Sequence, residues 1–145
     1  MRRVNLFAPE FDHESDRDGY RWRGMRVGKV LGAERIGASL YDLQPGERTY
    51  PYHFHNGMEE WLLVVSGAPV LRGPDGEHEL KAGDLVAFAT GSEGAHQVCG
   101  PGTVLILSAN RSPETVGYPD SGKVGVRPPG KLFRLDDSVD FWDGE

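Results

Sequence analysis

The sequence has very little cysteine and no long apolar segment. Cys99 is the only cysteine among 145 residues, so neither a disulfide within the chain nor a thiolate metal cluster can form. No apolar run exceeds five residues, as in Trp61 to Val65, whereas a transmembrane helix needs about 20. The amino-terminal residues contain no apolar stretch of signal-peptide length. We therefore expect a protein of a reducing compartment, with the cytoplasm as the default location and no membrane partner.

Excess positive charge is also missing. The formal net charge is −6, so the chain has no overall basic field that would attract nucleic acid or an anionic membrane. Its one basic cluster, Arg21 to Arg23 with Arg26, is short and follows an acidic run from Glu10 to Asp18. We expect no nucleic-acid partner.

Glycine, in contrast, is abundant. Twenty glycines and ten prolines interrupt the chain every few residues, and no segment of ten or more residues has a clear helical period. This composition favours an all-β chain of many short strands joined by tight turns, folded as a small antiparallel β-barrel or sandwich. The length fits one domain over residues 1–145, with a barrel core at about 36–110 between a polar N-terminal extension and a Pro- and Gly-rich C-terminal one.

Alternation of apolar and polar residues predicts the strands of this core. Turns are expected where Gly, Pro and Asp cluster, at residues 44–47, 73–76, 81–84 and 100–102. A loop is expected at residues 90–94. The predicted strands lie at residues 36–43, 60–65, 69–71, 77–80, 85–88, 95–98 and 103–108, with the third and fourth forming a hairpin.

Three histidines and a glutamate form a candidate metal site. His53 and His55 are separated by one residue, so in an extended segment both imidazoles project from the same face. Glu60, at the start of the next strand, and His96, after a glycine-rich loop, can reach the same point. Such a set suits one divalent transition metal ion of the group Zn, Fe, Ni, Mn, Co and Cu, and leaves coordination positions for water or substrate.

Other residues of the same types fit simpler roles. His13 and His78 each stand alone among acidic residues, and we interpret them as ordinary surface or hydrogen-bonded histidines. Glu59 is an alternative ligand to Glu60, although alternation with Leu62 and Val64 favours Glu60 as the residue that faces inward.

The sequence resembles the cupins at these residues. Residues 46–67, GERTYPYHFHNGMEEWLLVVSG, are similar to the first cupin motif. That motif begins with Gly and a spacer, continues with His-x-His and a Glu, and ends with a Gly six residues after the Glu. The spacing from Glu60 to Gly67 matches the motif and selects Glu60 over Glu59. The second motif is approached by residues 83–96, GDLVAFATGSEGAH, where Ala89 replaces a proline and two extra residues precede His96.

The resemblance implies a double-stranded β-helix, or jelly roll, with a metal ion on His53, His55, Glu60 and His96. It also implies an enzyme of the dioxygenase, isomerase or lyase type acting on a small polar molecule inside the barrel, with Glu60 either coordinating the metal or exchanging a proton. A binding or sensing module for a sugar or another small molecule is the alternative, because fold alone does not determine function. Four aromatic residues near the motif are candidates to line the pocket: Tyr50, Tyr52, Phe54 and Trp61.

Two further expectations concern the extensions. Val27, Val30 and Leu31 have too few apolar partners in a barrel of this size, and small cupins commonly pair, so we expect a homodimer. The segment from Ser112 to Lys123 is expected to be an irregular cover over the barrel mouth or a dimer contact.

Overall fold

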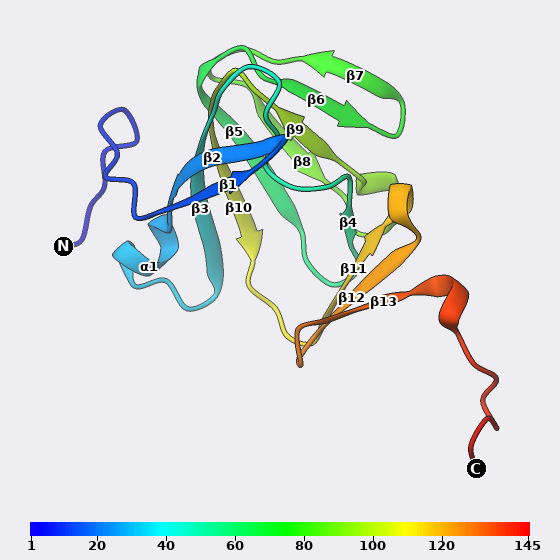
Figure 1. Cartoon of the computed structure of the whole chain (residues 1–145). Helices are drawn as coiled ribbons and strands as arrows, with labels where there is room; N and C mark the ends of the chain where they lie inside the picture. The colour runs from blue at the N-terminus through cyan, green and yellow to red at the C-terminus, as the bar shows by residue number, and fades with distance from the viewer.

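The structure, a computed structural model, describes all 145 residues and consists mainly of antiparallel strands arranged as a jelly roll (Figure 1). This confirms the all-β prediction. The only α-helix, α1 (Val27–Leu31), is a single short turn after the second strand. None of the helices has the length and apolar character needed to cross a membrane.

The largest sheet has six strands in the order β1-β2-β3-β10-β5-β8, all antiparallel. It brings the predicted first and last strands of the core into contact, since β3 and β10 pair over eight residues. The bounds of the six strands are β1 (His13–Arg17), β2 (Tyr20–Met25), β3 (Ile36–Leu43), β5 (Glu60–Gly67), β8 (Leu85–Phe88) and β10 (Gly102–Ala109).

One face of this sheet changes from polar to apolar along the strands. Because side chains alternate between faces, every second residue of β3, β10 and β5 contributes to the same surface. Aligned residues of β3, β10 and β5 form three successive rows: Gly37, Ser108 and Glu60; Ser39, Ile106 and Leu62; Tyr41, Val104 and Val64. The apolar end joins the main core, and the polar end is left to line a cavity.

The opposite face of the sheet carries a second apolar cluster. Leu40 and Leu105 point away from the cavity and pack with Met25, Val27 and Val65, while the N-terminal segment adds apolar side chains around them. Val27 thus finds its apolar partners within its own chain, with 4% of its surface exposed. The homodimer was expected because Val27, Val30 and Leu31 lacked apolar partners. For Val27 this reason is wrong, and it holds only for Val30 and Leu31, which stay exposed.

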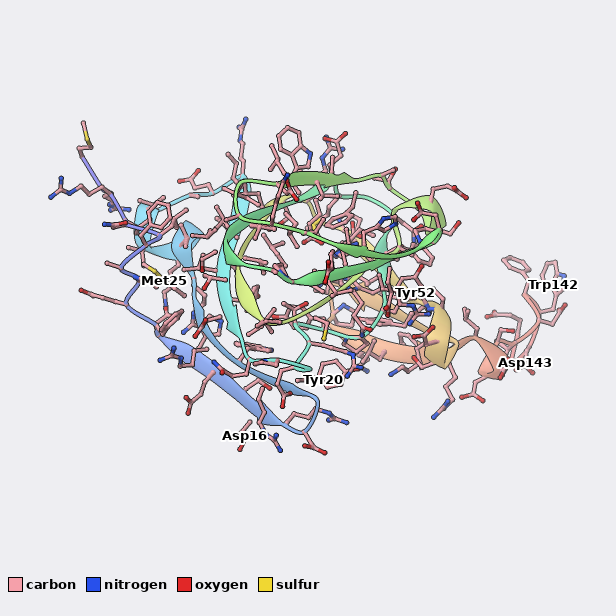
Figure 2. The ribbon with its side chains drawn as sticks, turned by 90° about the horizontal axis from the view of Figure 1, so that it is seen from above. Asp16, Tyr20, Met25, Tyr52, Trp142 and Asp143 are labelled. Carbon is pink, nitrogen blue, oxygen red and sulfur yellow. The ribbon has the colours of Figure 1, made fainter.

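The homodimer stays a prediction. Besides Val30 and Leu31, the C-terminal residues expose Phe133, Phe141 and Trp142 by more than half of their surface. Trp142 lies well away from the strands in Figure 2. Sedimentation equilibrium at micromolar concentration is expected to give twice the monomer mass, and a species of monomer mass alone would contradict the prediction.

A four-stranded sheet in the order β13-β12-β11-β4 forms another wall. It is built from β4 (Phe54–His55), β11 (Glu114–Tyr118), β12 (Lys123–Arg127) and β13 (Lys131–Arg134). The segment from Ser112 to Lys123 is not irregular as expected, because β11 pairs with β4 on one side and β12 on the other. Its role as a cover over the barrel mouth or as a dimer contact stays a prediction. Two 3₁₀ turns, η2 (Pro119–Ser121) and η3 (Leu135–Asp137), lie in the same region.

The third sheet contains the predicted hairpin. Strands β6 (Val70–Gly73) and β7 (Gly76–Glu79) pair across the expected turn, and β9 (Gln97–Cys99) adds to β6. The loop expected at residues 90–94 contains the 3₁₀ turn η1 (Ser92–Gly94). The strand expected at residues 95–98 begins later, because His96 forms an isolated bridge to His53 instead of joining β9.

Candidate metal centre

Backbone pairing brings two of the predicted ligands together. The amide of His53 donates to the carbonyl of His96 at 3.1 Å, and the amide of His96 donates back to the carbonyl of His53 at 2.8 Å. The imidazole rings of these two residues are 4.6 Å apart between centroids. His55 follows in β4, and Glu60 opens β5, so all four predicted residues converge on one region.

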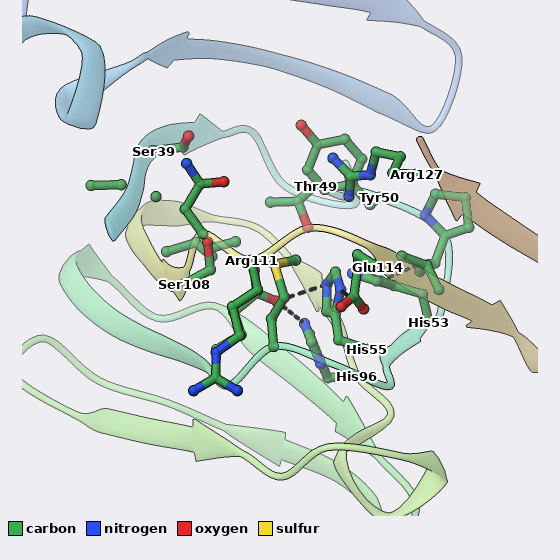
Figure 3. Close-up of a pocket in the computed structure, with 18 of the residues that line it drawn as sticks. Ser39, Thr49, Tyr50, His53, His55, His96, Ser108, Arg111, Glu114 and Arg127 are labelled. Carbon is green, nitrogen blue, oxygen red and sulfur yellow. Dashed lines mark hydrogen bonds and ion pairs between the residues drawn. The ribbon is translucent and has the colours of Figure 1, made fainter. Parts of the chain in front are cut away.

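Three of the four offer their ligand atoms to a common point. One atom each from His53, Glu60 and His96 lies within 4.8 Å of the others, a spacing that allows them to hold a metal ion. The Nε2 atom of His96 is 3.0 Å from Oε2 of Glu60. His55 lies beside this group, with its Nε2 atom 3.6 Å from the same carboxylate oxygen. Figure 3 shows the three imidazoles gathered at one side of the cavity.

The orientation of two rings is fixed by the backbone. Nδ1 of His53 lies 2.8 Å from the carbonyl oxygen of Pro51, and Nδ1 of His96 lies 2.9 Å from the carbonyl oxygen of Gly94. A carbonyl oxygen can only accept a hydrogen bond, so each Nδ1 carries the proton when the ring is neutral. The lone pair is then on Nε2, and in His96 this buried atom has no hydrogen-bond partner. A donor set of this kind fits a divalent transition metal.

A residue that sequence analysis missed supports His55. Glu114 of β11 is 3% exposed, and its Oε1 atom lies 3.4 Å from Nδ1 of His55 while accepting a hydrogen bond from the amide of Asn56 at 3.1 Å. Its Oε2 atom is buried without a partner, and Nδ1 of His55 makes no hydrogen bond either, so the contact between the two residues is an ionic one. A carboxylate on the Nδ1 side of a histidine directs Nε2 toward a metal and strengthens it as a ligand.

Burial and neighbouring charges set the protonation of the site. Burial is the main reason that the pKa of His53 falls to about 4, and repulsion from His96 and His55 lowers it further. Burial also acts against protonation of His55, but Glu60 and Glu114 outweigh it and raise the pKa of that imidazole. For Glu60, burial is opposed by the close imidazoles of His55 and His96, which hold its pKa at about 2. Near neutral pH, His53 is neutral and Glu60 is a carboxylate, as metal ligands must be.

The site opens into a cavity of about 490 Å³, within the range of small-molecule sites. Of the four aromatic residues expected to line it, only Tyr50 does. Trp61 points to solvent, with 46% of its surface exposed, and Tyr52 is buried beneath the guanidinium of Arg72. The other lining groups include hydroxyls, an amide and two guanidiniums, contributed by Ser39, Tyr41, Thr49, Ser108, Asn110, Arg111, Ser112, Tyr118 and Arg127.

The histidines interpreted as ordinary residues lie outside the cavity. His13 contacts Asp12 at 2.6 Å and packs against the edge of Trp22, and His78 contacts Asp75 at 3.1 Å. Gln97 and Cys99, which flank His96 in sequence, also do not line the cavity, and Gln97 donates a hydrogen bond to the carbonyl of Tyr50.

We expect Gly94→Ala to weaken metal binding by displacing His96. A Cβ atom at Gly94 would meet the backbone of Ala89, with its carbonyl carbon at 2.7 Å, so the loop must shift. The carbonyl of Gly94 would move with it and release the Nδ1 atom of His96. Gly91→Ala is the comparison, because a Cβ there meets open space and adds only the strain of a φ of +81°. Metal content and melting temperature of both variants give the test, and equal metal content would contradict the prediction.

The comparisons with known proteins agree with this architecture. The model of the family described as "Cupin domain" matches residues 39–110. A sugar phosphate isomerase of the cupin superfamily from Silicibacter pomeroyi is 27% identical, with 97% of this chain and 98% of that chain covered at a TM-score of 0.81. A protein from Acidithiobacillus ferrooxidans, provisionally named a sugar phosphate isomerase, is 26% identical over 84% of this chain and 81% of that chain, at a TM-score of 0.76.

A third solved structure shows the fold alone. The polyketide cyclase RemF from Streptomyces resistomycificus is 22% identical over 79% of this chain and 83% of that chain, at a TM-score of 0.60. No curated protein matches the sequence. Together, the domain match, the jelly-roll strands and these structural relatives show that the chain belongs to the cupin superfamily.

Proposed function

We propose that the protein is a metal-dependent isomerase that acts on a small polar molecule of the sugar type. The observation that carries the proposal is the group formed by His53, Glu60 and His96, whose ligand atoms lie within 4.8 Å of one another where they face the cavity. His55 completes the proposed set of four ligands. The ion is one of Zn, Fe, Ni, Mn, Co and Cu, which all accept imidazole together with a carboxylate.

When bound, such an ion polarises a carbonyl oxygen and acidifies hydroxyl groups of the substrate. Glu60 is better suited to hold the ion than to exchange a proton. Its pKa of about 2 makes it a weak proton acceptor, since an efficient general base has a pKa close to the working pH. We therefore place Glu60 in the site as a ligand, the first of the two roles expected for it.

Tyr50 is suited to orient the substrate. Its hydroxyl lies 2.9 Å from the hydroxyl of Tyr41, and burial, followed by the influence of Tyr41, raises its pKa well above the ordinary value. Tyr50 therefore keeps its proton and can donate it in a hydrogen bond to a substrate oxygen. The hydroxyls of Ser39 and Ser108, on neighbouring strands, offer further partners for a polyhydroxylated molecule.

The relatives support isomerisation over the other reaction types. Two of the structural relatives, at 26% and 27% identity, carry the name of a sugar phosphate isomerase, and one of them covers nearly all of this chain. An isomerase of this class moves a proton between adjacent carbon atoms of its substrate. In deuterated water, such a transfer exchanges a carbon-bound proton of the substrate for deuterium.

The test has two parts. Elemental analysis of untagged protein is expected to show one transition metal ion per chain, retained or loaded at neutral pH. The loaded protein is then incubated in D₂O with aldoses, ketoses and their phosphates, and proton NMR is expected to show deuterium at the carbon next to the carbonyl together with the isomeric product. His53→Ala is the matched control. Binding of these sugars without exchange would instead support the sugar-binding module, and absence of metal would overturn the proposal.

A further inference from the structure

Two arginines face the cavity from the C-terminal part of the chain, beyond the residues that the cupin domain match covers. Arg111 lies in the connection between β10 and β11, and Arg127 ends β12. Arg127 pairs directly with Glu114 of β11. Directly paired residues project from the same face of a sheet, so Arg127 shares the face of β11 that carries Glu114. Figure 3 shows both arginine side chains bordering the cavity.

Neither guanidinium is neutralised by an acidic side chain. Four arginines form ion pairs with carboxylates: Arg21, Arg23, Arg26 and Arg72. Of the arginines without an ion pair, only Arg111 and Arg127 line the cavity. Glu114 lies directly opposite Arg127 and nevertheless turns inward to His55 and Asn56. In a chain with a net charge of −6, two unpaired cations at one cavity indicate a ligand of negative charge.

Counting formal charges indicates how negative that ligand is. The cavity holds two carboxylates, Glu60 and Glu114, which one divalent cation would balance. The two guanidiniums then leave an excess of two positive charges. A phosphate monoester carries roughly −1.5 to −2 at pH 7 and accepts paired hydrogen bonds from arginine, whereas a carboxylate supplies a single charge.

The position of both arginines at one end of β11 fits a shared task. Arg111 precedes Glu114 by three residues, which span at most about 11 Å of chain. Arg127 pairs with the same Glu114, so its Cα atom lies about 5 Å away from that residue. Both long side chains therefore start near the same end of β11, and Ser112 and Tyr50 also line the cavity.

We infer that Arg111 and Arg127 form an anion subsite that selects a phosphorylated substrate. The inference rests on the proposed function, since it identifies the substrate class of the same cavity as phosphate monoesters of small polyhydroxylated molecules. The metal site then holds the reacting carbonyl and hydroxyl oxygens, and the arginines hold the phosphate.

Binding of inorganic phosphate, measured by isothermal titration calorimetry and by phosphorus-31 NMR, tests the subsite without turnover. The metal-free and metal-loaded wild-type proteins are both titrated at low ionic strength. We expect saturable binding with sulfate as a competitor. Acetate is expected to compete poorly, and equal competition by acetate would contradict the assignment to a phosphate in favour of a carboxylate.

Arginine variants decide the assignment. Arg111→Ala and Arg127→Ala are each expected to weaken phosphate binding about 10-fold, the size of effect expected for one charge-assisted hydrogen bond. Arg17→Ala is the matched control, because Arg17 is exposed, forms no ion pair and lies outside the cavity. Phosphate binding that survives the double variant Arg111→Ala/Arg127→Ala shows an adventitious ion only and overturns the inference.

This outcome is separate from failure of the proposed function. If the protein takes up no metal but binds phosphate through both arginines, the subsite stands and the metal-dependent isomerase does not. The opposite result is that metal binds and the sugars are isomerised, but neither a phosphate on the sugar nor the double variant changes the rate. In that case the isomerase stands and the subsite does not.

Discussion

Replacing His53 or His96 with alanine is expected to eliminate stoichiometric metal binding without loss of the fold. Each change removes an Nε2 atom from the proposed ligand set. Loss of a residue that only orients a ligand lowers metal affinity by up to about 100-fold, so loss of a ligand itself should lower it further. His55→Ala and Glu60→Gln are expected to act in the same direction. Metal content by elemental analysis and affinity by competition with a chelator provide the measurements.

The two histidine variants should differ in stability. His96 is 2% exposed and stacks on Phe88 with ring centroids 3.7 Å apart, so its loss leaves a cavity in the core. His53 is less buried, and its variant should retain the β signature in circular dichroism and most of the melting temperature. His13→Ala and His78→Ala are the controls, and metal loss in either of them, or full metal content in His53→Ala, would refute the assignment.

Glu114→Gln is expected to weaken metal binding by about 10- to 100-fold. The amide side chain keeps an oxygen that can accept the hydrogen bond from the amide of Asn56, but it removes the negative charge 3.4 Å from Nδ1 of His55. His55 then loses the group that directs its Nε2 atom toward the ion. The affinity for Zn or Co, measured by competition with a chelator at neutral pH, would show the change.

An exposed glutamate provides the comparison. Glu79→Gln, on β7, makes the same chemical change at a site remote from the cavity and should leave metal affinity unaltered. Electronic absorption of the Co-loaded protein adds a second observation, because a change in the orientation of His55 alters the ligand field, whereas a purely structural loss does not. Unchanged affinity and absorption in Glu114→Gln would show that His55 is held by other contacts.

The strands that could be predicted from sequence are those in which apolar and polar residues alternate because one face of the strand is buried in an apolar core. Strands β3 and β8 occur at the predicted bounds, because their apolar residues face one of the two cores and turn residues limit them. Strand β1 was missed because all five of its residues are polar and it lies at a sheet edge. Strand β11 was missed for another reason. Its inward-facing residues, which include Glu114 and Tyr118, line a cavity and do not pack in an apolar core, so they show no apolar alternation.

The same distinction explains the prediction of the site. His53, His55 and Glu60 lie within eight residues of sequence, so a motif describes them, and the structure places them with His96 around one point, although their role as ligands stays a proposal. Glu114 belongs to no motif and lies 58 residues after Asn56 in the sequence. It reaches His55 only because β11 pairs with β4. A pairing between strands so distant in sequence leaves no local signal. Alternation of Glu114, Val116 and Tyr118 was the one available indication of an inward face.

The attachment of β11 to the rest of the fold has a consequence for local opening. It pairs with β4 at two positions, Val116 with His55 and Gly117 with Phe54, and Asn56 adds hydrogen bonds to Glu114 and Thr115, whereas β10 pairs with β3 over eight residues. Segments held by few hydrogen bonds open at lower free energy than the central strands of a core. The amides of β11 and β12 should therefore exchange their hydrogens with solvent faster than those of β3 and β10. Because that unit carries Glu114 and Arg127, its opening would expose the cavity while the central sheet stays closed, so ligand exchange could proceed without global unfolding.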